Sequence, residues 1–138
     1  MKSIISAFAL LLVFFSSPSL ATDRIIDLTN VTVPVNPDGS MPTVEMVKQA
    51  IINGCRKRGW SPTITGDNKI TANIYVRSVH YAEIEISYSA KTYSITYKSS
   101  RGLDYDEKKR KIHRNYNKWV SMLSASIQRE FGVRAQGY

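Results

Sequence analysis

The sequence is poor in the residues that form disulfides, metal centres and nucleophilic sites. It contains one cysteine, Cys55, and two histidines, His80 and His113. One cysteine excludes an internal disulfide, and a structural zinc site needs about three or four ligands. Segments of the Gly-x-Ser-x-Gly and Gly-x-Gly-x-x-Gly types are also missing. We therefore expect no cofactor, no metal and no enzymatic activity, and a fold that depends on its apolar core.

Long apolar runs are missing too, apart from one at the N-terminus. Lys2 is followed by the apolar stretch 4–15, which only Ser6 interrupts, and small residues stand at Ser19 and Ala21. This order is typical of a secretory signal peptide. A membrane anchor is the alternative, but a spanning helix needs about 20 apolar residues. We expect a cleaved leader over 1–21, a single domain over 22–138 and no transmembrane segment in the mature chain.

Acidic residues are the minority among the charged side chains. The chain has 19 Lys and Arg against 11 Asp and Glu, a net charge of +8. Lys2 is the only charged residue of the predicted leader, so the mature chain would carry +7. Such a charge supports solubility and weak attraction to anions, but it specifies no function. Export argues against nucleic acid as the partner. The expected partner is an envelope protein or an anionic envelope component.

Two kinds of periodicity predict the secondary structure. Alternation at every second residue predicts strands, and steps of three and four residues predict helices. The predicted strands are 22–36, 60–65, 69–77, 80–88 and 92–99. A first helix is expected between Thr43, its N-cap, and Gly59, its C-terminal cap, with Cys55 buried and unreactive on its apolar stripe. This order predicts an α+β fold, a two-layer sandwich in which two amphipathic helices cover one face of an antiparallel sheet of about four strands.

The last helix has the clearest periodicity of the mature chain. Its apolar stripe, in which we expect Trp119 to be buried, consists of Ile112, Tyr116, Trp119, Leu123 and Ile127. The basic residues 108–111 fall at its predicted start, where cations oppose the helix dipole. Either this cluster has a binding role, or the neighbouring acids Asp104, Asp106 and Glu107 compensate it.

The candidate interaction surface has two parts. Tyr75, Arg77, Tyr81 and Lys98 point away from the predicted core among hydroxyl-bearing residues, a composition that suits a glycan or a peptide. A plain solvated face is the alternative, because antiparallel sheets commonly have one. His113 and Asn117 share one flank of the last helix. We expect both side chains to hydrogen-bond loop or strand backbone and so fix this helix on the sheet, with a ligand site as the alternative.

Three segments are distinctive together. They are Arg58-Gly59-Trp60, the strand segment 93–100, and Ile112-His113-Arg114-Asn115-Tyr116-Asn117-Lys118-Trp119. They resemble the Arg-Gly-Trp and Ile-His-x-Asn-Tyr-Asn-x-Trp segments of a group of small, uncharacterised bacterial periplasmic proteins and lipoproteins. The resemblance implies a location in the bacterial envelope, but no activity and no catalytic residue. Unlike the lipoprotein members, this chain has no cysteine directly after its apolar run.

The leading hypothesis is a non-enzymatic periplasmic or secreted protein, a binding or protein-interaction module of the cell envelope. The alternative is a small envelope hydrolase or metal-dependent enzyme that uses His80 or His113 with nearby acids. A third possibility is an oligomerising structural module that pairs through the edge strand within 22–35. If both histidines and a carboxylate converged on one pocket, the enzyme hypothesis would gain weight.

Cleavage of the leader is directly measurable. We expect the exported protein to begin at Thr22, because small residues stand at Ser19 and Ala21 before that bond. Mass spectrometry of the exported protein tests this. An intact N-terminus on a membrane-bound species would contradict it.

Overall fold

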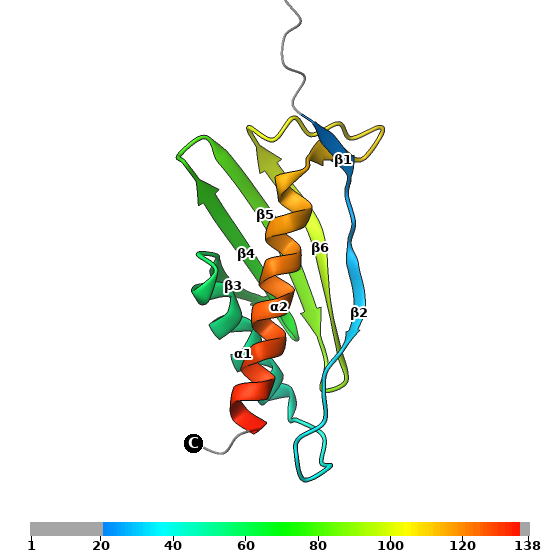
Figure 1. Ribbon diagram of the computed structural model, residues 1–138, viewed down its shortest axis with the longest axis vertical. Helices are drawn as coiled ribbons and strands as arrows, with labels where there is room; N and C mark the ends of the chain where they lie inside the picture. Colours follow the sequence, from blue (N-terminus) through cyan, green and yellow to red (C-terminus); the bar gives the residue numbers. More distant parts are fainter. Residues whose placement is uncertain (1–20, 136–138) are drawn as a thin grey trace, which may run out of the picture.

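The computed structural model describes residues 21–135 (Figure 1). Residues 1–20 of the predicted leader and the last three residues lie outside this range, so the expected leader is not described. Along the chain the elements are β1 (Thr22–Arg24), β2 (Leu28–Thr32), α1 (Val44–Lys57), β3 (Ser61–Gly66), β4 (Lys69–Val76), β5 (His80–Tyr88), β6 (Thr92–Arg101), β7 (Lys111–His113) and α2 (Asn115–Ala135). Within the described range, neither helix is long and apolar enough to cross a membrane.

Helix α1 begins and ends as its sequence predicts. The Thr43 hydroxyl accepts a hydrogen bond from the backbone N–H of Met46 at 3.1 Å, as an N-cap does. Gly59 follows the helix with a φ of +78°, and the Trp60 N–H donates to the Cys55 carbonyl at 2.9 Å. The predicted burial of Cys55 is confirmed, and this burial raises the pKa of the Cys55 thiol to about 12. The thiol therefore stays protonated at neutral pH.

The main sheet is antiparallel throughout, with the strand order β2-β6-β5-β4-β3. The α+β class is confirmed, but the expected number of about four strands is too low, because this sheet has five. The N-terminal segment also forms two strands instead of one. Strand β2 pairs with β6 at the sheet edge, whereas β1 pairs with β7 in a separate two-stranded sheet. Between them, buried Ile25 donates its N–H to the Arg110 carbonyl at 2.8 Å, away from the main sheet.

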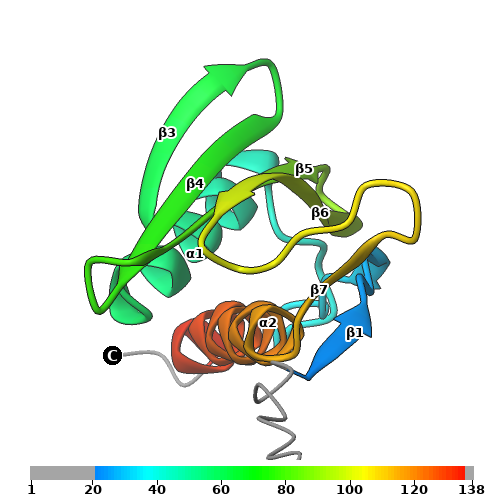
Figure 2. The ribbon, with the colours of Figure 1, turned by 90° about the horizontal axis from the view of Figure 1, so that it is seen from above.

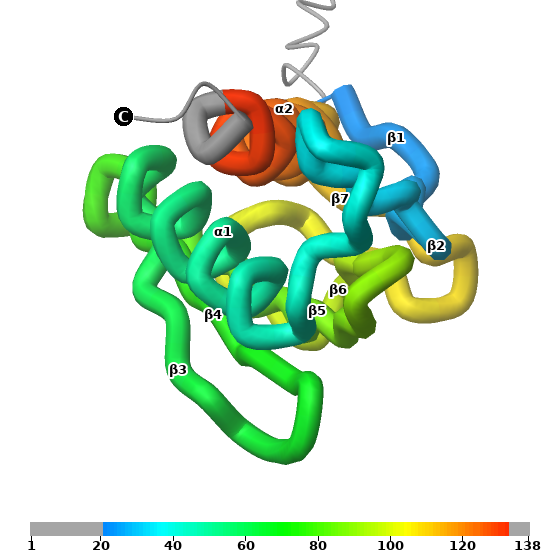
Figure 3. The backbone as a smooth tube through the Cα atoms, turned by 90° about the horizontal axis from the view of Figure 1, so that it is seen from below, coloured from blue at the N-terminus to red at the C-terminus, as the bar shows by residue number. Residues whose placement is uncertain are grey.

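Both helices lie on one side of the five-stranded sheet (Figure 2) and run next to each other (Figure 3). The core between helices and sheet consists of residues that alternate inward along the strands and recur at three- and four-residue steps along the helices. Its largest fully buried side chains are Val33, Ile51, Ile70, Ile84, Ile86, Tyr93, Ile95, Leu103, Ile112, Tyr116, Leu123 and Ile127. With Cys55 unpaired, burial of this apolar surface is the main term that stabilises the fold.

The segment before α2 differs from the prediction. Residues 107–110 form a turn, which is closed by two backbone hydrogen bonds between Asp106 and Lys111, 2.8 and 3.2 Å long. Strand β7 follows, and α2 begins only at Asn115. Ile112 is buried as predicted, but as a strand residue. The basic residues 108–111 therefore precede the helix, and the expected conflict with its dipole does not arise within its first turn.

Helices α1 and α2 approach most tightly at Gly54. A Cβ atom on Gly54 would lie 2.7 Å from Cγ1 of Ile127 and 3.0 Å from the Ile127 backbone nitrogen. The backbone of a packed helix cannot move aside as the end of a flexible side chain can. The spacing of the two helices therefore requires a residue without a side chain at position 54.

We expect Gly54→Ala to destabilise the domain by about 1–2 kcal/mol, because overpacking a tight contact outweighs the helix propensity that alanine adds. Gly132→Ala is the matched control, since Gly132 also lies in a helix but has no atom within 4 Å of its Cβ position. Thermal and urea unfolding of both variants test this. The control should be as stable as the native protein or more so, and equal stability of the two variants would contradict the close contact.

Candidate functional site

The outward face of the sheet brings together part of the predicted interaction surface. The rings of Tyr75 and Tyr81, which are paired across β4 and β5, lie 4.7 Å apart. Arg101 donates from Nη2 to the Tyr75 hydroxyl at 2.9 Å, and its guanidinium lies 4.5 Å from the centre of the Tyr81 ring. The face therefore carries a pair of tyrosines bridged by an arginine.

Arg101 reaches this face because of a β-bulge in β6. Glu83 pairs with Ser99, but the next residue of β5, Ile84, pairs with Tyr97, so Lys98 is the extra residue. An extra residue reverses the alternation beyond it. Arg101, which lies beyond the predicted strand 92–99, consequently stands opposite Tyr81 on the outward side.

The polar ends of this cluster are largely used by the cluster itself. The Tyr81 hydroxyl donates to Glu83 Oε2 at 2.6 Å, and Lys98 forms an ion pair with Glu83 Oε1 at 3.1 Å. The hydrogen bond to Glu83 raises the pKa of Tyr81 to about 12, and the same bond, with help from Lys98, lowers the pKa of Glu83. Tyr75, 61% exposed, is the main ring left for a partner.

Arg77 is not on the sheet face where the sequence analysis placed it. Strand β4 ends at Val76, and Arg77 and Ser78 occupy the hairpin turn with φ of 53° and 58°. Arg77 lines a hollow of about 230 Å³, and the other residues that line it are Val76, His80, Asn115 and Trp119. Arg77 thus belongs to a different surface from Tyr75 and Tyr81.

A second, smaller hollow of about 50 Å³ shares one lining residue, Trp119, with the first. It is lined by Arg58, Trp60, Ile74, Trp119 and Met122. Trp119 lines both hollows, and we call them together the Trp119 cleft. Trp119 is half-buried and packs against the edge of the core, so the prediction of a buried Trp119 is wrong in degree.

The geometry of α2 explains how this cleft forms. Asn115, Trp119 and Met122 follow one another at four- and three-residue steps, and so share one flank of the helix. The neighbouring flank carries Tyr116 and Leu123 into the core. The other side of the cleft is formed by two segments. Strand β4 contributes Ile74 and Val76, and the segment that follows α1 contributes Arg58 and Trp60.

Positive charge is unopposed in the Trp119 cleft. None of its lining residues is Asp or Glu. Arg58 is held by a 2.7 Å hydrogen bond from Nε to the Ser126 hydroxyl, which leaves its other guanidinium nitrogens free of a carboxylate among the described residues. Arg77 likewise has no ion pair within residues 21–135. The cleft therefore combines two cations with the half-buried ring of Trp119, and the ring of Trp60, which is buried in the core, forms its floor.

The two histidines lie close together, with ring centres 6.0 Å apart. His80 Nδ1 donates to the Gly102 carbonyl at 2.8 Å, so its Nε2 carries the free lone pair of the neutral ring. Of the two, only His80 lines the cleft, and no Asp or Glu lines it. In the described part of the chain no three His, Cys, Asp or Glu side chains are grouped to hold a metal ion. The arrangement that would favour the enzyme alternative, both histidines and a carboxylate around one pocket, is not found at these hollows.

Asn117 and His113 hold the start of α2 in different ways. The Asn117 side chain accepts from the Ile26 N–H at 3.0 Å and donates to the Arg24 carbonyl at 2.9 Å, which confirms its expected bonding to backbone. His113 belongs to β7, and its Nδ1 accepts from the Asn115 N–H at 3.2 Å. Its anchor to the preceding loop is made by its backbone N–H, which donates to the Leu103 carbonyl at 2.8 Å, and not by its side chain as expected.

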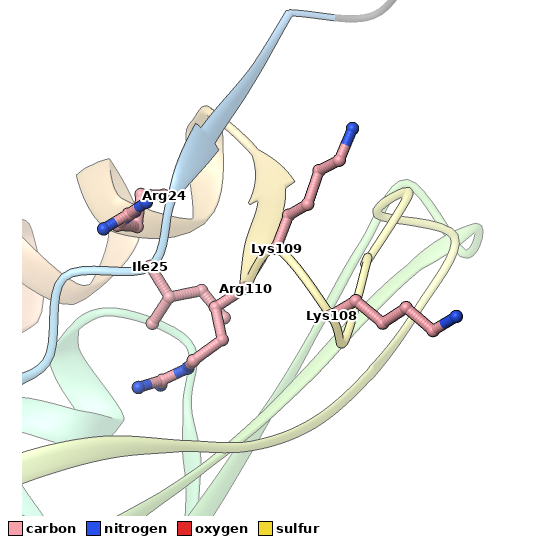
Figure 4. A pocket seen from close by; sticks show the side chains of 5 residues that line it. All are labelled: Arg24, Ile25, Lys108, Lys109 and Arg110. Carbon is pink, nitrogen blue, oxygen red and sulfur yellow. The ribbon is translucent and has the colours of Figure 1, made fainter.

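A third hollow, of about 320 Å³, lies beside the turn 107–110. Arg24, Ile25, Lys108, Lys109 and Arg110 line it, and the long side chains of the four basic residues point in different directions (Figure 4). Arg110 is also neutralised by an ion pair with Asp27 at 3.1 Å. Because these cations diverge, they do not form a site around one ligand. The Trp119 cleft is the better candidate.

Asn117→Ala should destabilise the domain by about 1–2 kcal/mol, because the variant loses both hydrogen bonds to the N-terminal segment. Asn53→Ala is the matched control, as Asn53 is a partly buried helical asparagine whose side chain makes no hydrogen bond within the described residues. Urea unfolding compares the two variants. Equal stabilities of the two variants would show that the two Asn117 hydrogen bonds add nothing to the stability of the domain.

Comparison with known proteins adds no relative. The chain matches no protein-family model, no curated protein and no solved structure. The resemblance noted in the sequence stays a prediction, and the candidate site depends on geometry and chemistry alone.

Proposed function

We propose that this chain is an exported, non-enzymatic binding protein of the bacterial envelope, and that it binds its partner through the Trp119 cleft. The observation that carries the proposal is the pair of hollows that share Trp119, with two tryptophans, two arginines and no acid in their lining. Aromatic residues and arginine are the side chains that dominate the energetics of protein interfaces. The predicted leader places such a module outside the cytoplasm.

The backbone beside the cleft supports the same proposal. Arg77 and Ser78 are consecutive non-glycine residues in the left-handed region. Such conformations cost about 1–3 kcal/mol each and are concentrated at ligand-binding and switch sites. Here the turn places Arg77 at the cleft instead of on the sheet face.

The outward sheet face and the histidine pair support competing functions less well. On the sheet face, Tyr81, Glu83, Lys98 and Arg101 satisfy one another, so a partner would have to break contacts to gain new ones. At the histidines, general acid–base chemistry would need a group with a tuned pKa within reach of a substrate, and the cleft supplies no carboxylate for this.

The test is a comparative capture from solubilised bacterial envelope, with three forms of residues 22–138 as bait. Met122→Glu places a charge at the apolar hollow on an exposed helix position. Lys98→Glu places the same side chain on the sheet face and is the control. We expect a component that is retained by the native bait and by Lys98→Glu, and that Met122→Glu retains at least about tenfold less. The carboxylate replaces an apolar side chain of the hollow and stands where it can pair with Arg58, so the hollow loses apolar surface and a free cation.

Circular dichroism and thermal unfolding must show all three baits folded. A component that Lys98→Glu loses and Met122→Glu keeps would place binding on the sheet face. Components that all three baits retain equally would contradict the proposal.

A further inference from the structure

The Trp119 cleft has two chemically different halves, and they define a ligand more narrowly than the proposed function does. The smaller hollow is mainly apolar: Trp60, Ile74, Trp119 and Met122 provide four of its five lining side chains. Its volume of about 50 Å³ suits a small side chain such as that of alanine or valine. The larger hollow is polar and basic, with Arg77, His80 and Asn115 around its 230 Å³.

The polar half offers a cation, a donor and an acceptor that the fold leaves unused. Arg77 has no ion pair within the described residues. The Asn115 side chain makes no hydrogen bond there either, since only its backbone N–H bonds to His113. His80 Nε2 is an acceptor in the neutral ring, because Nδ1–H is engaged by the Gly102 carbonyl. Together these groups fit a carboxylate and a neighbouring amide N–H.

From this arrangement we propose that the Trp119 cleft binds the carboxyl-terminal residue of a peptide chain. The terminal carboxylate pairs with Arg77, the amide N–H of that residue donates to His80 Nε2 or to the Asn115 side-chain oxygen, and its small apolar side chain enters the hollow between Trp60 and Met122. A chain end brings these three groups together within one residue. This inference rests on the proposed function of the cleft and names its ligand.

The apolar hollow and the acceptors of the polar half favour a chain end over a glycan of uronic acids. A glycan of uronic acids could supply the anion, but it has no small apolar group for the Trp60 hollow and no amide N–H in a fixed relation to its carboxylate. Binding of a terminal carboxylate by a dedicated pocket is an established mode of peptide recognition. The overall positive charge of the domain also attracts an anionic chain end.

The chain contains a built-in reporter for this test. It has two tryptophans, and both of them line the small hollow. A ligand in the cleft therefore lies next to every tryptophan of the chain and should change the tryptophan fluorescence. A ligand on the sheet face contacts no tryptophan, so it should leave that fluorescence unchanged. The protein, residues 22–138, is titrated with three peptides while its tryptophan fluorescence is measured. Acetyl-Gly-Gly-Val is the reference, its carboxamide lacks the terminal negative charge, and acetyl-Gly-Gly-Gly lacks the last side chain.

We expect the free acid to bind roughly tenfold to a hundredfold more tightly than the carboxamide, the range for losing a charged hydrogen bond. Arg77→Gln should abolish that difference and leave the affinity for the carboxamide unchanged. Arg101→Gln, which removes a cation from the sheet face, should preserve it. The glycine-ended peptide should bind more weakly than the valine-ended one by roughly threefold to thirtyfold, from lost burial of a small side chain.

Each other result overturns the inference. Equal binding of acid and carboxamide, or a preference for the acid that survives in Arg77→Gln, excludes recognition of the carboxylate at this position. Emission that responds to none of the peptides also excludes it. If envelope capture then still depends on Met122, the proposed function stands and its ligand is of another class; if capture does not depend on Met122, both fail.

Discussion

The contact between the two helices at Gly54 is the constraint on which the other features of the fold depend. Without a disulfide, the domain is held by one apolar core, and that core forms only if α1 and α2 both lie over the same face of a narrow sheet. The missing side chain at Gly54 lets the Ile127 backbone come close enough for this. With the helices side by side, Arg58 of the α1 exit lies beside Ser126 of α2, and the Trp119 cleft opens along the same flank.

Local periodicity made much of this architecture predictable. Strands β4, β5 and most of β6 alternate cleanly, and α1 carries both of its capping signals, Thr43 and Gly59, in the sequence. The errors fall where tertiary pairing overrides local pattern. Ile112 continues the helical spacing of Tyr116, yet β1 recruits the segment 111–113 into a strand. The sequence of residues 106–113 does not indicate this pairing, because the partner strand β1 lies at the other end of the domain.

The candidate site was predictable only in part, for similar reasons. Tyr75 and Tyr81 meet because strand alternation and a short hairpin bring them together. Arg101 joins them only through a bulge, which a two-residue period cannot reveal. Trp119 fits the apolar stripe by spacing, but spacing does not distinguish the centre of a stripe from its border. The cleft consists of residues from four separate segments, so no single stretch of sequence signals it.

The pairing of β1 with β7 has a consequence for the order in which the domain forms. Thr22 lies opposite His113, and Asn117 bonds the backbone next to β1, so the first residues of the domain are fixed by residues more than ninety positions later. Contacts of such long sequence separation carry a high loop-closure cost and form late. Because a chain is synthesised from its N-terminus, β1 has no pairing partner until residues 111–117 have been added. The topology thus makes completion of the fold wait for synthesis of the last part of the domain.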